Sequence, residues 1–420
     1  MKEYIVDLHL HSKYSRSVSR DMDLETMAAW GDKKGIEVLA TADFTHPAWL
    51  KEIETKLIPL DNGLFQLKNK QTNTKFILST ELSCIYSQDD AVRRLHILVI
   101  MPDIKSIKKF NELLKKDGGK LTSDGRPILG ISAERITELA KQANKESMVI
   151  PAHIWTPWFA MFGSKSGFDT VEECFGSQAK HIHAIETGLS SDPAMNWRVS
   201  QLDRMQIISS SDAHSAKKMG REATVLQLEK LSYDNIKTAI EKPDAKNKIS
   251  YTIEFYPEEG KYHFDGHRAC QVRLSPAETK KHKGICPKCK KKITIGVMNR
   301  IEQLADRDEN YQPKNRPPFK SIVPLDEIIS DAFGVGPNSK KVQTEYDKII
   351  ANVAPEFEVL LNTPKEKIAQ HAEPEVTEGI MRVRQGKMHL LPGYDGEFGT
   401  VKVFTDAERK NMEKRQKKLF

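Results

Sequence analysis

Seven short apolar runs in the first 230 residues end in, or are followed at once by, side chains that bind metal ions in many proteins. The first run is YIVDLHL, the last is QIISSSDAH, and amphipathic segments such as AERITELAKQANK lie between them. Apolar runs that alternate with helical segments predict parallel strands joined by helical crossovers. We therefore expect residues 1–230 to form an α/β domain built as a seven-stranded β/α barrel.

The candidate metal ligands lie toward the carboxyl ends of these runs. In a β/α barrel the carboxyl ends of all strands form one face, so residues that are distant in sequence would meet there. A single histidine on a strand is more often structural, but a set at successive strand ends is typical of a metal centre. The set comprises His9, His11, Asp43, His46, Glu81, His96, His153, Glu186, Asp212 and His214.

The chemistry follows from these ligand types. His9 and His11 are two residues apart, which places both imidazoles on one side of a strand, where they can bind one ion. Imidazole with carboxylate suits zinc or manganese better than magnesium, and such ions activate a water for attack on phosphorus. We expect Asp212 to be indispensable, as a ligand or as the group that orients the water; the alternative is a carboxylate that caps a turn.

The motifs that carry these residues resemble the polymerase and histidinol phosphatase (PHP) family over about residues 1–225. The resemblance rests on DLHLHSKYS, TADFTH, STELS, RLHIL, PAHIW and SSDAHS. It implies a distorted seven-stranded barrel that holds two or three divalent ions (Zn, Mn or Mg) and in which Glu81 bridges two of them. It also implies three ligand groups: His9, His11 and Asp212 around one ion, His96 and His153 around a second, and His214 at a third.

The chain departs from the PHP pattern at two positions. Ser17 stands where many members have a histidine, and Phe44 follows Asp43 where the family commonly has Thr-Asp-His. His46 or Asp21 are the residues that could compensate. Two ions are therefore the expected core of the centre, and the third depends on these positions.

A second ligand group follows a charged linker near residues 240–250. Two pairs of soft ligands, each pair with two intervening residues, are separated by fifteen residues, a spacing typical of a tetrahedral structural zinc site. The four ligands are His267, Cys270, Cys286 and Cys289, with His263 and His282 as alternatives. We expect a zinc ribbon over residues 251–296, and buried core thiols at the two other cysteines, Cys84 and Cys174.

Two features suit a nucleic-acid partner. The ribbon is dense in cations that can contact phosphate backbones, among them Lys280, Lys281, Lys290 and Lys291, although a solvated basic face is the alternative. The segment after His153 is rich in aromatic side chains, which predict either a stacking platform for bases or ordinary core packing. These are Trp155, Trp158, Phe159, Phe162 and Phe168.

The order of barrel and ribbon, with YHFDGH, VRLSPAET and GICPKC in the ribbon, resembles the endonuclease Q family of DNA-repair enzymes. The resemblance implies a metal-dependent endonuclease that hydrolyses a phosphodiester on the 5′ side of hypoxanthine, uracil, xanthine or an abasic site. Its partner would be DNA that contains damaged bases. Two alternatives stay open: a PHP-type phosphomonoesterase for small molecules, and a zinc-dependent DNA-binding factor that has lost catalysis.

The rest of the chain predicts a mainly helical DNA-binding region over residues 297–405 and a basic tail over residues 406–420. Gln416, Leu419 and Phe420 in the tail resemble a motif that docks on sliding clamps, although a solvated charged tail is the alternative. No apolar run approaches the length of a membrane span, and the N-terminal sequence lacks a secretory pattern. We expect a cytoplasmic, nucleoid-associated protein, and the net charge of +7 suits a polyanionic partner.

Overall fold

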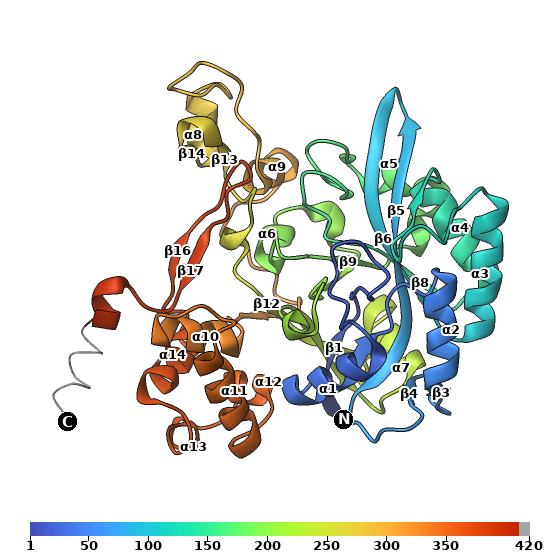
Figure 1. Cartoon of the computed structure of the whole chain (residues 1–420). Helices are drawn as coiled ribbons and strands as arrows, with labels where there is room; N and C mark the ends of the chain where they lie inside the picture. Colours follow the sequence, from blue (N-terminus) through green and yellow to red (C-terminus); the bar gives the residue numbers. More distant parts are fainter. Residues whose placement is uncertain (411–420) are drawn as a thin grey trace.

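A computed structural model describes residues 1–410, and its largest element is a sheet of eleven strands (Figure 1). The strands are β1 Lys2–Asp7, β2 Val38–Ala40, β3 Leu57–Pro59, β4 Phe65–Leu67, β5 Lys75–Gln88, β6 Ala91–Met101, β7 Ile128–Leu129, β8 Met148–Pro151, β11 Ala223–Leu228, β12 Lys248–Glu254 and β15 Phe319–Ser321. Hydrogen bonds join them in the order β15-β12-β11-β1-β2-β5-β4-β3, and β6, β7 and β8 pair off this path. The chain is thus a mixed α/β protein with a central sheet.

All seven predicted strands are present. Five lie in the central sheet as β1, β2, β5, β6 and β8, and the last two form a separate parallel pair, β9 Ala184–Glu186 and β10 Gln206–Ile208. β1, β2 and β5 run parallel, as predicted, but β6 is antiparallel to both β5 and β8. The prediction of parallel strands was wrong for β6, because only Asp89 and Asp90 separate it from β5. Both have positive φ, as a two-residue hairpin turn requires.

One buried apolar cluster lies within the sheet. It takes side chains from strands that are distant in sequence, among them Val6 of β1, Ile77 of β5, Ile150 of β8 and Ile208 of β10. These strands therefore share a common core, to which β9 and β10 contribute Ala184 and Ile208. Hydrogen bonds between the described strands do not join β8 to β9, so closure into a barrel stays a prediction.

Helices cover the outside of this sheet (Figure 1). They are α1 Leu24–Lys34, α2 Pro47–Lys56, α3 Ile104–Lys116, α4 Ala133–Ala143, α5 Val171–Phe175, α6 Pro193–Trp197 and α7 Tyr233–Glu241. Asp23, Asp103, Ser132 and Ser232 each precede one of the longer helices and accept a hydrogen bond from a backbone N–H of its first turn. These caps satisfy donors that a helix cannot pair internally, which explains where the helices begin.

The second half of the chain builds a small module and a group of helices. The module contains β13 Asp265–His267, β14 Val272–Leu274 and α8 Pro276–Lys281, and α9 Val297–Leu304 follows it. The helices are α10 Leu325–Phe333, α11 Lys340–Asn352, α12 Glu356–Leu361, α13 Lys365–Ala369 and α14 Pro374–Arg384. A two-stranded ribbon, β16 His389–Leu391 and β17 Thr400–Lys402, runs between module and helices (Figure 1). The helical C-terminal region is confirmed, but the strands β11, β12 and β15 of the central sheet were not predicted.

No helix within residues 1–410 is long and apolar enough to cross a membrane.

A buried ion pair attaches the C-terminal helices to the sheet domain. Lys34 in the last turn of α1 places its Nζ 2.9 Å from Glu356 Oε2 of α12, and the two side chains are 3% and 4% exposed. The same carboxylate accepts hydrogen bonds from the Tyr346 hydroxyl, at 2.7 Å, and from the backbone N–H of Leu325, at 3.1 Å. A charge this deep is tolerated only with such partners.

We predict that Glu356→Ala lowers the free energy of unfolding by about 3–5 kcal/mol, because it leaves the charge of Lys34 buried without a partner. Asp347→Ala is the matched control, since it breaks the Lys33–Asp347 pair, whose side chains are 41% and 49% exposed. Exposed pairs contribute about 1 kcal/mol or less. Urea denaturation followed by tryptophan fluorescence measures both, and equal small losses would contradict a stabilising role for the buried pair.

Candidate metal centre

The segment that follows β1 is held against the segment that follows β10. His11 donates its backbone N–H to the carbonyl of Ala213 at 3.2 Å, and Asp7 accepts hydrogen bonds from the backbone N–H groups of Ser211 and Gly220. Burial raises the pKa of Asp7 to about 6, although these hydrogen bonds lower it. Asp7 therefore fixes the loop that carries Asp212 beside the two histidines that follow β1.

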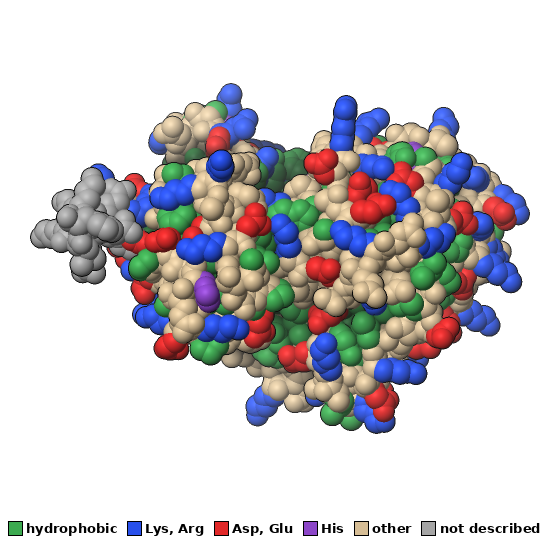
Figure 2. Space-filling view, turned by 60° about the horizontal axis from the view of Figure 1, so that its bottom comes forward, with side chains coloured by type: hydrophobic (Ala, Val, Ile, Leu, Met, Phe, Trp, Pro, Cys, Tyr) green, Lys and Arg blue, Asp and Glu red, His purple; other side chains and the backbone are tan. Residues whose placement is uncertain are grey.

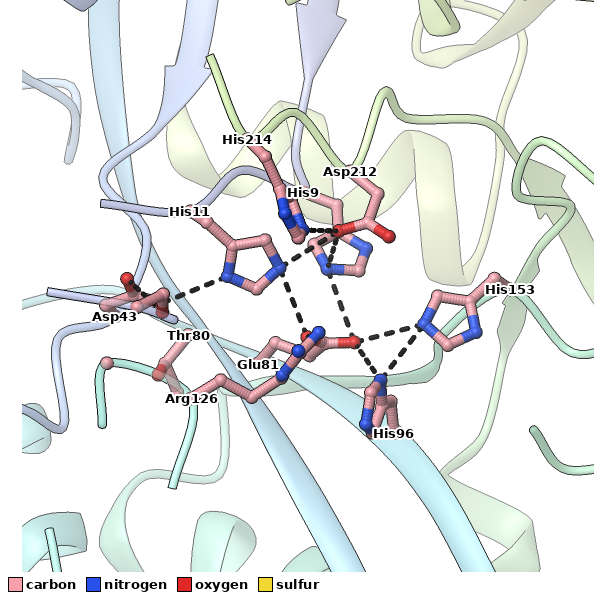
Figure 3. Close-up of polar contacts among 12 residues, drawn as sticks. His9, His11, Asp43, Thr80, Glu81, His96, Arg126, His153, Asp212 and His214 are labelled. Atoms are coloured by element: carbon pink, nitrogen blue, oxygen red, sulfur yellow. Dashed lines mark hydrogen bonds and ion pairs between the residues drawn. The ribbon is translucent and has the colours of Figure 1, made fainter. Parts of the chain in front are cut away.

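Four of the predicted ligands form one group (Figure 3). His9, His11, Glu81 and Asp212 offer ligand atoms that all lie within 4.8 Å of one another. His11 Nε2 lies 2.9 Å from Asp212 Oδ1 and 3.3 Å from Glu81 Oε2. The two histidines and Glu81 are completely buried, so the group is shielded from water on most sides.

A second group shares Glu81 with the first (Figure 3). His96 Nδ1 lies 2.7 Å and His153 Nε2 lies 3.1 Å from Glu81 Oε1, and the three residues again satisfy the distances of a metal site. Glu81 Oε2 thus faces His11 of the first group, and Oε1 faces the second group and also His9 of the first. A carboxylate placed in this way can bridge two ions.

One buried nitrogen of the centre lacks a hydrogen-bond partner and is placed to bind a metal ion. His9 Nε2 is buried and has no hydrogen-bond partner within residues 1–410, and it lies 3.5 Å from both Glu81 Oε1 and Asp212 Oδ1. A nitrogen that is left unpaired between two carboxylates offers its lone pair to a cation. The donor set of imidazole and carboxylate suits zinc or manganese.

The charges of the two groups depend on each other. Burial lowers the pKa of His9, but the carboxylates of Glu186, Glu81 and Asp212 outweigh it and raise that pKa well above its usual value. Burial raises the pKa of Glu81, but His96 and Arg126 hold it well below its usual range. Because histidine binds metal only when neutral, ion binding here would release protons.

Asp43 and Glu186 lie behind the histidines and outside both groups. Glu186 Oε2 lies 3.0 Å from His9 Nδ1, and Asp43 Oδ1 lies 3.4 Å from His11 Nδ1. Carboxylates in this place fix the ring orientation and tautomer of a histidine ligand. The second oxygen of Asp43 accepts hydrogen bonds from the hydroxyls of Ser12 and Ser15, so Asp43 also orders the loop after His11.

Three residues of the centre have a backbone conformation that side chains other than glycine rarely adopt. Asp43, His153 and Asp212 have φ values of 42°, 30° and 47°. Such conformations cost about 1–3 kcal/mol each and concentrate at functional sites. They occur where strands turn into loops, and they aim these side chains toward the centre.

The other sequence candidates lie at the margin. His214 Nε2 is 3.6 Å from Asp212 Oδ1 and its side chain is 38% exposed, so it faces the open side of the centre. His46 belongs to neither group and stacks on Tyr14 at 4.6 Å. Asp21 and Ser17 are exposed, and neither belongs to a group. Phe44 is buried and packs on Phe110, which explains an apolar residue at that position.

Arg126 was missed by the sequence reasoning. Its guanidinium lies 3.0 Å from Glu81 Oε2, and its side chain is 26% exposed. It comes from the loop before β7, which has no strand pattern to mark it. Nothing in a single sequence indicates that Arg126 lies beside Glu81.

The aromatic segment after His153 divides into two parts. Trp155, Phe162 and Phe168 are buried and belong to the core. Trp158 and Phe159 are half-buried: Phe159 lies 4.9 Å from the ring of His96, and Trp158 lies 5.3 Å from Tyr262. Of these two, Phe159 lies beside a residue of the centre.

The four predicted ribbon ligands also come together. His267, Cys270, Cys286 and Cys289 satisfy the distances of a metal site, and the alternatives His263 and His282 do not join them. Cys286 packs with Val272 and Ile293 in a small apolar cluster of the module. The four module lysines predicted to contact phosphates are exposed; they are Lys280, Lys281, Lys290 and Lys291. The clamp-like residues Gln416, Leu419 and Phe420 lie outside the described residues.

The two remaining cysteines, Cys84 and Cys174, are buried core thiols, as predicted.

Comparison with known proteins gives three kinds of similarity. A family model described as MJ0043 C-terminal domain matches residues 324–387. The uncharacterized protein YqxK of Bacillus subtilis is 30% identical over 423 residues, which cover 96% of this chain and 100% of that protein. The uncharacterized protein MJ0043 of Methanocaldococcus jannaschii is 33% identical over 254 residues, which cover 59% of this chain but only 31% of that longer protein.

Two solved structures match almost the whole chain. The lesion-specific endonuclease PfuEndoQ from Pyrococcus furiosus is 30% identical, with a TM-score of 0.84 over 96% of this chain and 95% of that one. Endonuclease Q in complex with a 27-mer duplex substrate with an abasic lesion at the active site has the same identity and TM-score, over 97% and 98%. This chain belongs to the endonuclease Q family.

Proposed function

We propose that this protein is a metal-dependent endonuclease of DNA repair that cleaves one strand beside a damaged nucleotide. The observation that carries the proposal is Glu81, which belongs to both of two adjacent groups of metal-ligand side chains. Support for DNA as substrate comes from the endonuclease Q structure that holds a duplex with an abasic lesion at its active site. We further propose cleavage on the 5′ side, with deaminated bases (hypoxanthine, uracil or xanthine) as substrates besides abasic sites.

The residues of the centre would have two roles, to bind the ions and to orient the residues that bind them. His9, His11 and Asp212 would hold one ion, His96 and His153 a second, and Glu81 both. Divalent ions in these places supply a Lewis acid that activates water and neutralises phosphate oxygens. Glu186 and Asp43 keep the rings of His9 and His11 oriented.

Access to the centre is from the side of His214 and Asp212, whose side chains are 38% and 28% exposed. His214 is placed to contribute to a third ion or to orient a water or phosphate oxygen there. The buried walls formed by His9, His11 and Glu81 exclude bulk water, which strengthens every charge interaction inside.

Zinc is proposed for the group His267, Cys270, Cys286 and Cys289, which would make the module a zinc ribbon. Its exposed lysines suit contact with phosphate backbones. By contrast, Lys and Arg are interspersed with Asp and Glu over the face seen in Figure 2. A face with both signs of charge is a poor surface for DNA, so DNA binding is favoured on the side of the module.

Two alternatives are weaker. A small-molecule phosphomonoesterase would share the metal ligands but has no need of a basic module beside the sheet domain. A DNA-binding factor without catalysis would not need His9 Nε2 to stay unpaired between two carboxylates. Both alternatives are outcomes of the experiment that follows.

The deciding experiment is incision of an end-labelled duplex with one abasic site, deoxyuridine or deoxyinosine, in manganese, magnesium or zinc. We expect a single metal-dependent nick on the 5′ side of the lesion. Asp212→Asn should slow it about a hundredfold or more, since it removes several kcal/mol of stabilisation of the metal and the transition state. Asp61→Asn, at an exposed carboxylate between β3 and β4, is the matched control and should cut at the rate of the unaltered protein.

Uncut DNA with every metal would refute the endonuclease proposal. Turnover of a chromogenic phosphomonoester would then favour the phosphatase, and a gel shift without a nick would favour the binding factor. Normal cutting by Asp212→Asn would leave an endonuclease whose active site lies elsewhere.

The zinc proposal predicts the metal content of the purified protein. Cys286→Ser should contain about one zinc fewer per chain by plasma mass spectrometry, because three ligands hold the ion weakly. Cys174→Ser, which changes a buried thiol far from the module in sequence, is the control and should keep its zinc. Cys270→Ser, at a half-buried position, repeats the test if Cys286→Ser misfolds. Unchanged zinc in the module variants would show that these residues hold none.

A further inference from the structure

A cavity of about 440 Å³ lies between the start of β6 and the loop of residues 163–169. This volume is typical of a pocket for a small ligand. Four cationic side chains line it against a single carboxylate; they are Arg93, Arg94, Lys165 and Arg300, with Asp169. The excess of cations predicts an anion as the ligand.

Two of the cations build the walls. Arg300 donates to the carbonyl oxygens of Phe162 and Phe168, both at 2.9 Å, and pairs with Asp169. Arg93 lies over the ring of Phe168 at 4.2 Å and donates to the carbonyl of Gly167. The single carboxylate of the lining is thus already neutralised by Arg300.

The other two cations are free to bind. Within residues 1–410 the side chains of Arg94 and Lys165 have no hydrogen bond or ion pair, and Lys165 is exposed. Ser164 Oγ and Arg93 Nε are buried and have no hydrogen-bond partner among residues 1–410. The lining of the cavity therefore holds unpaired positive charge, and two of its buried polar atoms also lack a partner.

The loop that forms one wall is tightly constrained. A Cβ on Gly167 would lie 2.4 Å from the backbone nitrogen of Gly163, and a Cβ on Gly163 would lie 2.6 Å from the carbonyl oxygen of Thr156. Only glycine permits these approaches. The cavity is accordingly preformed rather than shaped by a mobile loop.

The cavity is joined rigidly to the metal centre by β6. Arg94 N–H donates to the Ser166 carbonyl at 3.2 Å, and His96 N–H donates to the Phe159 carbonyl at 3.1 Å, so the loop follows the strand from the cavity to the centre. Residues two apart on a strand share a face, and a rise of about 3.3 Å per residue places Arg94 about 7 Å from His96.

We propose that this cavity binds a backbone phosphate of the DNA strand near the bond that is cleaved. Arg94 lies about 7 Å along β6 from His96, so the bound phosphate would be close to the cleaved one along the strand. The proposal rests on the proposed endonuclease function. The cavity would set which phosphodiester reaches the metal centre, because it fixes the strand at a second point.

The test is single-turnover incision by the intact protein as a function of protein and salt concentration. The double variant Arg94→Gln/Lys165→Gln should raise the half-saturating protein concentration several-fold. It should also reduce the salt slope by about 0.9 for the lost phosphate contact. Lys230→Gln/Lys242→Gln is the matched control: it removes two exposed charges at the far end of the sheet, where Leu228 of β11 pairs with Lys2 of β1.

A scan with single neutral methylphosphonates identifies the bound phosphate. One position near the cleaved bond should weaken incision by the unaltered protein and have no further effect on the double variant, since both changes remove the same contact. If the unaltered protein nicks damaged DNA but the double variant keeps its half-saturating concentration and salt slope, the cavity proposal is wrong and the endonuclease proposal stands. If the unaltered protein nicks nothing, both proposals fail.

Discussion

The buried carboxylate of Glu81 is the group on which the arrangement of the centre depends. It has no exposed surface, and its oxygens lie within 3.5 Å of His9, His11, His96, His153 and Arg126. A charge this deep costs several kcal/mol unless it is compensated. The partners come from the segment after β1, the middle of β6, the segment after β8 and the loop before β7, so compensation of one charge requires four separate segments to converge.

Convergence of these segments was predictable because strand ends share one edge of a sheet. His9, His11, His153 and Asp212 follow that rule, whereas Glu81 and His96 lie in the middle of β5 and β6; the structure brings all six into two groups with a common member. The supporting contacts were not predictable. In sequence Asp43 and Glu186 look like ligands, but in the structure they contact the ligands His9 and His11 instead. Only side-chain distances distinguish these two roles.

Other failures of the sequence reasoning have physical causes as well. The period of an apolar run marks a strand but not its direction, which for β6 is decided by two aspartates with positive φ. β15 was missed because three residues beside prolines carry too little pattern. The Lys34–Glu356 pair could not be predicted because charged residues are normally exposed. The two residues are also 322 positions apart in the sequence, so nothing in the sequence links them.

The loop that carries Asp212 and His214 is held from two sides, and this explains how the C-terminal helices bear on the centre. On the inner side Asp7 accepts hydrogen bonds from Ser211 and Gly220. On the outer side Lys217 pairs with Asp326 at 3.0 Å, and Arg221 pairs with Glu327 at 2.9 Å, both on α10. The phenyl ring of Phe357 lies so close to Gly220 that a Cβ there would meet it at 3.0 Å. The C-terminal helices thus support the loop of Asp212 and His214 through contacts that begin at Lys217, three residues after His214.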